Sequence, residues 1–129
     1  MTGVAKRRGI EGTVIDGTCR DTNRSLELDY PVFSVNRYMR TGKDRVQVEA
    51  IGEPVSVANV RVRPGDIIVG DADGVVAIPK EMEERVLAVA LEIEEAENKI
   101  CEAIEQGMRL DEARQLFKYH SLQSKEEQV

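Results

Sequence analysis

The hydrophobic pattern of this chain changes once, at Lys80, and that change limits the folds the sequence can adopt. Before Lys80, apolar residues alternate or form short β-branched runs bounded by glycine and proline, which is typical of strands. After it, they recur at steps of three and four, which predicts one amphipathic helix from about Glu81 to Gln106, ended by Gly107. Consecutive strands followed by a long helix favour an α+β fold over a doubly wound sheet.

The part before Lys80 predicts a helix end and then five or six strands. Gly9 stops the first helix, the first strand ends at Gly17, and Asp21 or Thr22 caps a short helical turn in the loop that follows. Strands are also expected over 31–35, 45–51 and 54–62, the last with a turn or bulge at Ala58-Asn59. A tight turn should follow at 63–66, and a hairpin of two buried strands should form around 71–74. Beyond Lys80, a second helix is expected from Asp111 to about Lys118.

Composition narrows the class of protein. A chain of 129 residues is the length of one domain, which we place at 1–119, followed by a polar tail at 120–129. The net charge is −6 with both signs intermixed, and aromatic residues make up 4%, which argues against direct nucleic-acid binding. No apolar run is long enough for a membrane span or a secretory signal, so we expect a cytoplasmic protein with Cys19 and Cys101 as reduced thiols.

The charged pair Arg20-Asp21 follows the first predicted strand, directly after a glycine turn. Arginine offers a planar fork for a carboxylate, and aspartate offers hard oxygens for a divalent cation, so the pair can hold a metal-chelated oxo acid. The alternative from local pattern is that the two residues only cap and pair across a loop. Both interpretations stay open on the residues alone.

Other candidate sites are weaker. The segment "DADG" resembles the start of a calcium loop, but counting from Asp71 puts Met82 where the twelfth-position glutamate should stand, so a turn is the better interpretation. His120 is the only histidine, which excludes a histidine nucleophile relay and a multi-histidine zinc site. The acids of the long helix read most simply as a solvated face, with pairs such as Glu95 to Lys99.

Several motifs in order resemble one known family. The segments "GIEGTVIDGTCRD", "YPVFS", "PVSVANVRVRPGDIIVGDADGVVAIP" and "ICEAIEQGMRLDEA" resemble the family of the regulator of ribonuclease activity A (RraA-like) and the 4-hydroxy-4-methyl-2-oxoglutarate aldolases, over residues 9 to about 114. The resemblance implies a swivelling three-layer β/β/α domain with a long C-terminal helix, assembled as a homo-oligomer, a trimer or hexamer, with sites between subunits.

The resemblance also implies an activity and its residues. Aldolase members use Mg²⁺, or a similar ion such as Mn²⁺, to cleave 2-oxo acids to pyruvate, and many decarboxylate oxaloacetate. In that scheme Asp21 is the metal ligand and Arg20 is catalytic and holds the substrate, with Gly17 also at the substrate. Glu97, on the long helix, approaches a neighbouring subunit's metal through water.

Two departures from the family pattern qualify this scheme. The family has an acid three residues after the aspartate, where this chain has Arg24. A glycine-led loop whose amides bind the substrate carboxylate should precede Arg20 by about twenty residues, so we expect an N-terminally truncated domain with open strand edges. The sequence therefore predicts a metal-dependent lyase or a fragment of one. The alternative is a non-catalytic protein that regulates a ribonuclease or helicase by contact.

Overall fold

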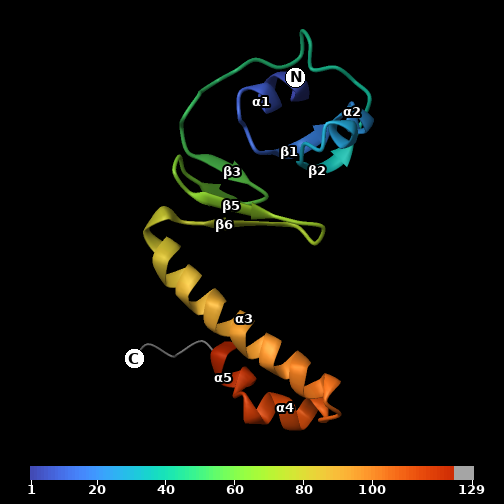
Figure 1. Ribbon diagram of the computed structural model, residues 1–129. Helices are drawn as coiled ribbons and strands as arrows, with labels where there is room; N and C mark the ends of the chain where they lie inside the picture. Colours follow the sequence, from blue (N-terminus) through green and yellow to red (C-terminus); the bar gives the residue numbers. More distant parts are fainter. Residues whose placement is uncertain (124–129) are drawn as a thin grey trace. The chain divides into compact units, whose positions relative to one another are not determined.

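The computed structural model describes residues 1–123 and contains both helices and strands (Figure 1). The chain divides into two compact units, residues 1–80 and the residues from 81 onward. This division falls where the hydrophobic pattern changes from strand-like to helical, which confirms a mixed fold with small sheets and one long helix. The three-layer arrangement and the 1–119 boundary stay predictions. No helix in the described part of the chain combines the length and the apolar character that crossing a bilayer requires.

The first unit holds two helices and six strands. Within residues 1–123 the strands form three separate pairs: β1–β2 is parallel, and β3–β4 and β5–β6 are antiparallel. The bounds are α1 Thr2–Arg7, β1 Thr13–Cys19, α2 Thr22–Glu27, β2 Val32–Arg37, β3 Val55–Val57, β4 Val60–Val62, β5 Ile67–Gly70 and β6 Val75–Ile78. In the described residues each pair has two edges without a further strand.

The parallel pair β1–β2 is joined through α2, which fills the crossover that parallel strands need (Figure 1). The prediction that the first strand ends at Gly17 was wrong, because pairing continues to Cys19. The register shifts between Ile15 and Thr18, and this irregularity takes up Gly17 inside the strand. Arg20 is therefore the first residue after the carboxyl end of β1.

The turn between β3 and β4 lies at Ala58-Asn59, where the alternation slips. Both residues have positive φ, 47° and 66°, as a two-residue hairpin turn requires. The Asp16 Oδ2 accepts a hydrogen bond from the backbone N–H of Ala58 at 3.1 Å, which ties this turn to β1. The predicted turn is confirmed, and it is anchored by a residue 42 positions away.

The hairpin β5–β6 forms around the segment 71–74, with Asp71 Oδ1 accepting from the backbone N–H groups of Asp73 and Gly74. This confirms a turn in place of a calcium loop. The strands are not buried as predicted, because Val69 and Val76 are 55% and 61% exposed. These exposures show that the side chains are not covered in the described structure, and each of the two strands pairs only with the other.

No strand forms over 45–51, where alternation predicted one. Residues 46–50 have no regular structure, and Val46, Val48 and Ile51 are among the most exposed apolar side chains of the first unit. Alternating β-branched residues fit a pleated, half-buried surface, but they form a strand only when a neighbouring strand supplies hydrogen bonds. In the described chain this segment has no such neighbour.

Gly70 ends β5 beneath the aromatic ring of Phe33, on β2. A Cβ atom added to Gly70 would lie 2.6 Å from the Phe33 Cζ atom, closer than real Cβ contacts allow. Glycine therefore lets the β5 backbone approach the ring at this point.

Asp66 closes the turn at 63–66, and its carboxylate accepts two backbone hydrogen bonds. Oδ2 accepts from the N–H of Arg63 at 2.7 Å, and Oδ1 accepts from the N–H of Lys80 at 3.1 Å. The bond from Arg63, with a smaller contribution from Lys80, lowers the pKa of Asp66 below its ordinary value. The ionised carboxylate therefore holds both the start of β5 and the segment after β6.

Acid should loosen this turn. Because the pKa of Asp66 is lower in the folded state, its contribution to stability is present above about pH 4 and lost as the pH falls through the folded-state pKa. Asp66→Asn should lower stability at neutral pH and make acid unfolding, followed by circular dichroism, less steep below about pH 4. Asp73→Asn, an exposed aspartate in the next turn, should keep the wild-type slope. Equal slopes in the two variants would contradict the role of Asp66.

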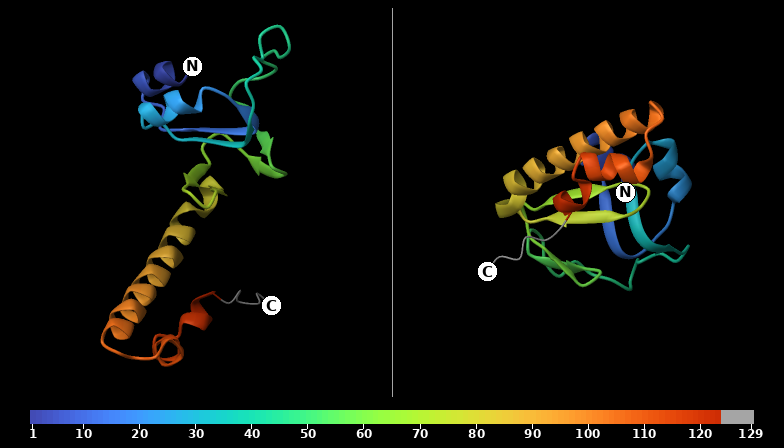
Figure 2. Two further views of the ribbon diagram at one scale, coloured as in Figure 1. Left: turned by 90° about the vertical axis from the view of Figure 1, so that its right-hand side faces the viewer. Right: turned by 90° about the horizontal axis from the view of Figure 1, so that it is seen from below.

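The second unit is built on the long helix α3, Glu83–Glu105, preceded by a 3₁₀ turn at Lys80–Met82. The chain reverses at Gly107, whose φ of +92° is one that glycine adopts readily, and α4, Leu110–Leu116, and α5, Tyr119–Gln123, turn back along α3 (Figure 2). The helix and its stop are confirmed, whereas α5 begins before the expected polar tail. The rest of that tail, 124–129, lies outside the described residues.

The core of this unit lies where α3 meets α4. Ile100 and Ala103 of α3 are buried against Ala113 of α4, and Phe117 and Tyr119 pack on this cluster. Alanine at two of the three core positions lets the helix backbones approach closely.

Candidate functional site

Arg20 and Asp21 lie between β1 and α2, at the carboxyl end of β1. The Nε atom of Arg20 is 3.4 Å from the Oδ2 atom of Asp21, and the two side chains are 50% and 72% exposed. The structure thus brings the predicted pair together and leaves it open to solvent. An ion pair this exposed adds little to stability, about 0–1 kcal/mol, so structural need does not explain it well.

The backbone of Asp21 is left-handed, with φ 60° and ψ 33°. Asp21 occupies the N-cap position of α2, but its side chain makes no capping hydrogen bond; its backbone C=O accepts from the N–H groups of Arg24 and Ser25. The prediction that Asp21 or Thr22 caps this helix is confirmed for the position of Asp21, but the expected side-chain hydrogen bond is absent. The Asp21 carboxylate contacts Arg20 instead of the helix backbone. Aspartate adopts this region more readily than most non-glycine residues, and Asp29 does so as well, so the backbone alone does not mark Asp21 as functional.

Gly17 lies within β1, three residues before Arg20. A Cβ atom added there would meet only the Cγ2 atom of Ile15 at 3.7 Å, an ordinary contact distance. Packing therefore does not require glycine at this position, and its substrate-binding role stays a prediction.

Arg24, at the position where the family resemblance implies an acid, lies in α2 and pairs with Glu27, its Nη1 atom 2.9 Å from Oε2. Its charge is thus balanced by a neighbour on the same helix. The positive charge that Arg24 brings to this position is therefore partly offset by the negative charge of Glu27.

The candidate site offers a cation the carboxylate of Asp21, which is paired with Arg20. Among the residues that the structure describes, no cluster of three histidine, cysteine or acidic side chains is placed to enclose a metal. Mg²⁺ does not need such a cage, because it keeps several waters and binds through one or two carboxylates together with its substrate. One exposed carboxylate, flanked by a guanidinium that can take a substrate anion, suits that mode of binding.

Glu97 lies in the second unit, on the exposed side of α3, whereas Gly17, Arg20 and Asp21 belong to the first. The hydroxyl of Tyr119 donates a hydrogen bond to the Oε1 atom of Glu97 at 2.7 Å. The guanidinium carbon of Arg114 lies 5.5 Å from the centroid of the Tyr119 ring. Glu97 is therefore held by a neighbouring helix, unlike a simple solvated acid.

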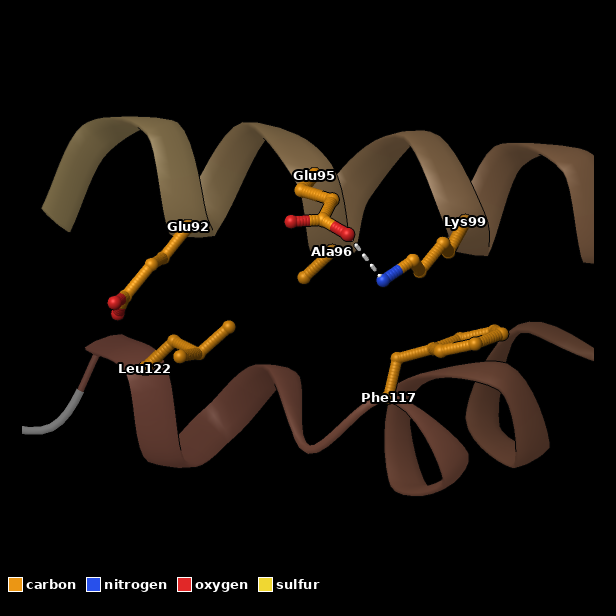
Figure 3. Close-up of a pocket in the computed structure, with 6 residues that line it drawn as sticks. All are labelled: Glu92, Glu95, Ala96, Lys99, Phe117 and Leu122. Atoms are coloured by element: carbon orange, nitrogen blue, oxygen red, sulfur yellow. Dashed lines mark hydrogen bonds and ion pairs between the residues drawn. The ribbon is translucent and has the colours of Figure 1, made fainter. Parts of the chain in front are cut away.

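A hollow of about 210 Å³ lies between α3 and the helices that follow it (Figure 3). Glu95 pairs with Lys99 at its edge, at 2.6 Å, and the ammonium of Lys99 lowers the pKa of Glu95. The other lining residues are Glu92, Ala96, Phe117 and Leu122. An apolar floor with one satisfied ion pair is a packing groove, and it offers no converging groups for catalysis.

Two contacts could not be found from the sequence. Tyr119 reaches Glu97 across 22 residues, and Asp16 reaches Ala58 across 42. Neither pair has a local spacing that signals contact. Cys19 and Cys101 are free thiols, and Ser34 Oγ donates to the Cys19 Sγ atom at 3.1 Å.

The chain is a small mixed fold of helices and strands with an exposed arginine–aspartate pair after its first strand. Its sequence is similar to one family of proteins. Residues 1–77 match the RraA-like family, described as Aldolase/RraA. The match covers more than half of the chain, so the chain belongs to the RraA-like family.

Individual relatives agree with this assignment. A Halalkalibacterium halodurans protein named "Putative 4-hydroxy-4-methyl-2-oxoglutarate aldolase" is 46% identical over 70% of this chain and 42% of its own length. Protein MJ0644 of Methanocaldococcus jannaschii, uncharacterized, is 42% identical over 82% of this chain and 50% of its own. The crystal structure of an uncharacterized Pseudomonas syringae protein matches with a TM-score of 0.86 and 38% identity, over 90% of this chain and 55% of that one. The chain thus spans about half the length of these relatives.

Proposed function

We propose that the protein is a divalent-metal-dependent carbon–carbon lyase that acts on 2-oxo acids. The reactions are cleavage of 4-hydroxy-4-methyl-2-oxoglutarate to pyruvate and decarboxylation of oxaloacetate. The observation that carries the proposal is the exposed Arg20–Asp21 pair at the carboxyl end of β1, whose aspartate side chain makes no helix-capping hydrogen bond. The pair lies inside the segment that matches the Aldolase/RraA family.

Each residue has a separate task in this proposal. Asp21 would hold Mg²⁺, or alternatively Mn²⁺, through its carboxylate, and water would fill most other positions. The bound cation would supply the Lewis acid that draws electron density from the 2-oxo group. Arg20 would bind the substrate's carboxylate and balance negative charge as the carbon–carbon bond breaks. Gly17 would leave room for substrate beside the strand.

We propose the reaction for an assembly of copies, a trimer or hexamer. Glu97 of a neighbouring copy would accept hydrogen bonds from the water around the cation. Because the proposed site takes Glu97 from a neighbouring copy, the assembly rather than one copy is the unit to assay. The aldolase name of the relatives favours this lyase over a regulator of a ribonuclease or helicase.

The test is pyruvate release by the purified full chain. After removal of metal with a chelator, oxaloacetate and 4-hydroxy-4-methyl-2-oxoglutarate are supplied with and without Mg²⁺. We expect release at least about tenfold above that of buffer with the same metal, since aqueous Mg²⁺ alone is a weaker catalyst than a cation held in a site. A rate equal to that of buffer with Mg²⁺, for both substrates, would refute the proposed lyase.

A further inference from the structure

We propose that Tyr119 is a positioning residue that fixes the Glu97 carboxylate for its place beside the metal's water shell. The inference rests on the proposed function and extends it to a residue outside the segment that matches the family, 1–77. It starts from the 2.7 Å hydrogen bond between the Tyr119 hydroxyl and Glu97 Oε1.

Tyr119 is itself firmly placed. Lys118 has a positive φ of 53°, which breaks the helix between α4 and α5 and turns the chain so that Tyr119 returns to α3. The ring packs against the core cluster that contains Ile100 and Ala113. A half-buried ring with a fixed backbone presents its hydroxyl in one direction.

The hydrogen bond from Tyr119 restricts the side chain of Glu97. A glutamate on an exposed helix face would ordinarily sample several side-chain rotamers. The bond to Tyr119 holds one carboxylate oxygen, Oε1, and leaves Oε2 for hydrogen bonds from water. Groups that orient the side chains around a metal contribute to metal affinity, and their removal weakens binding.

Arg114 makes a second contact with Tyr119. Its guanidinium carbon lies 5.5 Å from the centroid of the Tyr119 ring, and this cation–π contact helps to hold the ring in place. The three side chains form a chain of contacts from Arg114 through Tyr119 to Glu97. The geometry suits positioning of an anion more than packing alone, since packing needs only the ring.

The experiment is a double-mutant cycle in the full chain, with Tyr119→Phe, Glu97→Gln and the double variant. The readouts are Mn²⁺ affinity by electron paramagnetic resonance and the Mg²⁺ dependence of pyruvate release. We expect Tyr119→Phe to weaken metal affinity about tenfold in the wild type and to have no effect once Glu97 is glutamine. Tyr30→Phe is the matched control, because it loses a hydrogen bond of the same 2.7 Å length, to Thr13 in the first unit.

The outcomes separate the two proposals. If the wild type is active and Tyr119→Phe changes nothing, or changes both backgrounds by the same factor, the positioning role is wrong and the lyase stands. If the wild type neither binds Mn²⁺ nor releases pyruvate, the proposed function fails and the inference fails with it. An equal loss of metal affinity in Tyr30→Phe and Tyr119→Phe would also overturn the positioning role.

Discussion

Replacing Asp21 by asparagine is expected to remove metal-dependent pyruvate release, with a loss of at least about a hundredfold in kcat/KM. Asparagine has the size of aspartate but a neutral amide, so it loses the charge that would hold the cation. It is also one of the few residues that tolerates a left-handed backbone, so the φ of 60° at this position adds no new strain. Alanine would confound the two effects, because it is strained there.

The chain offers a matched control for this substitution. Asp29 is also exposed and also left-handed, with φ 47°, and it lies in the same unit just after α2. Asp29→Asn therefore tests the same chemical change on a similar backbone, and it should keep wild-type turnover and Mg²⁺ dependence. If Asp21→Asn retained activity, or if the two variants lost it equally, Asp21 would not be the metal ligand.

Replacing Ile100 by alanine is expected to destabilise the second unit by about 2–4 kcal/mol. Ile100 is 6% exposed and lies where α3 meets α4, opposite Ala113, which is 0% exposed. Two alanines in the cluster leave few atoms that can move into the space, so the cavity should collapse only partly. The loss should appear as a lower urea midpoint in unfolding followed by helical circular dichroism.

Ile104 provides the comparison for that measurement. It lies one turn further along α3 and is 40% exposed, so Ile104→Ala removes the same atoms from a partly solvated position. We expect it to cost less than about 1.5 kcal/mol, in proportion to the smaller area withdrawn from water. Equal destabilisation by the two substitutions would mean that α4 does not pack on Ile100 as described.

Local chemistry explains which elements were predictable. The helix α3 and its stop at Gly107 followed from helical periodicity, and the turn at Ala58-Asn59 followed from one slip in alternation. Both signals lie within a few residues of the feature that they specify. The segment 45–51 shows the limit, because its alternation is real but a strand also needs a partner, which local sequence does not reveal.

The candidate site divides in the same way. Arg20 and Asp21 are neighbours in sequence, and their pairing after β1 could be predicted from the strand and its glycine. The left-handed backbone of Asp21 could not, because aspartate also adopts ordinary helical and extended conformations. The bond from Tyr119 to Glu97 depends on a reversal at Gly107 and a kink at Lys118, each of which had to be placed before the contact followed.

The contact between Gly70 and Phe33 has a consequence for how this chain can change over evolutionary time. The two positions are 37 residues apart by their numbers, yet a methyl group gained at one would occupy the space of the ring at the other. A change at position 70 requires the ring at position 33 to move or to become smaller, whereas a smaller residue at position 33 meets no clash with Gly70. Sterics therefore favour one order of substitution, and related chains should show the two changes as a pair with the change at position 33 first.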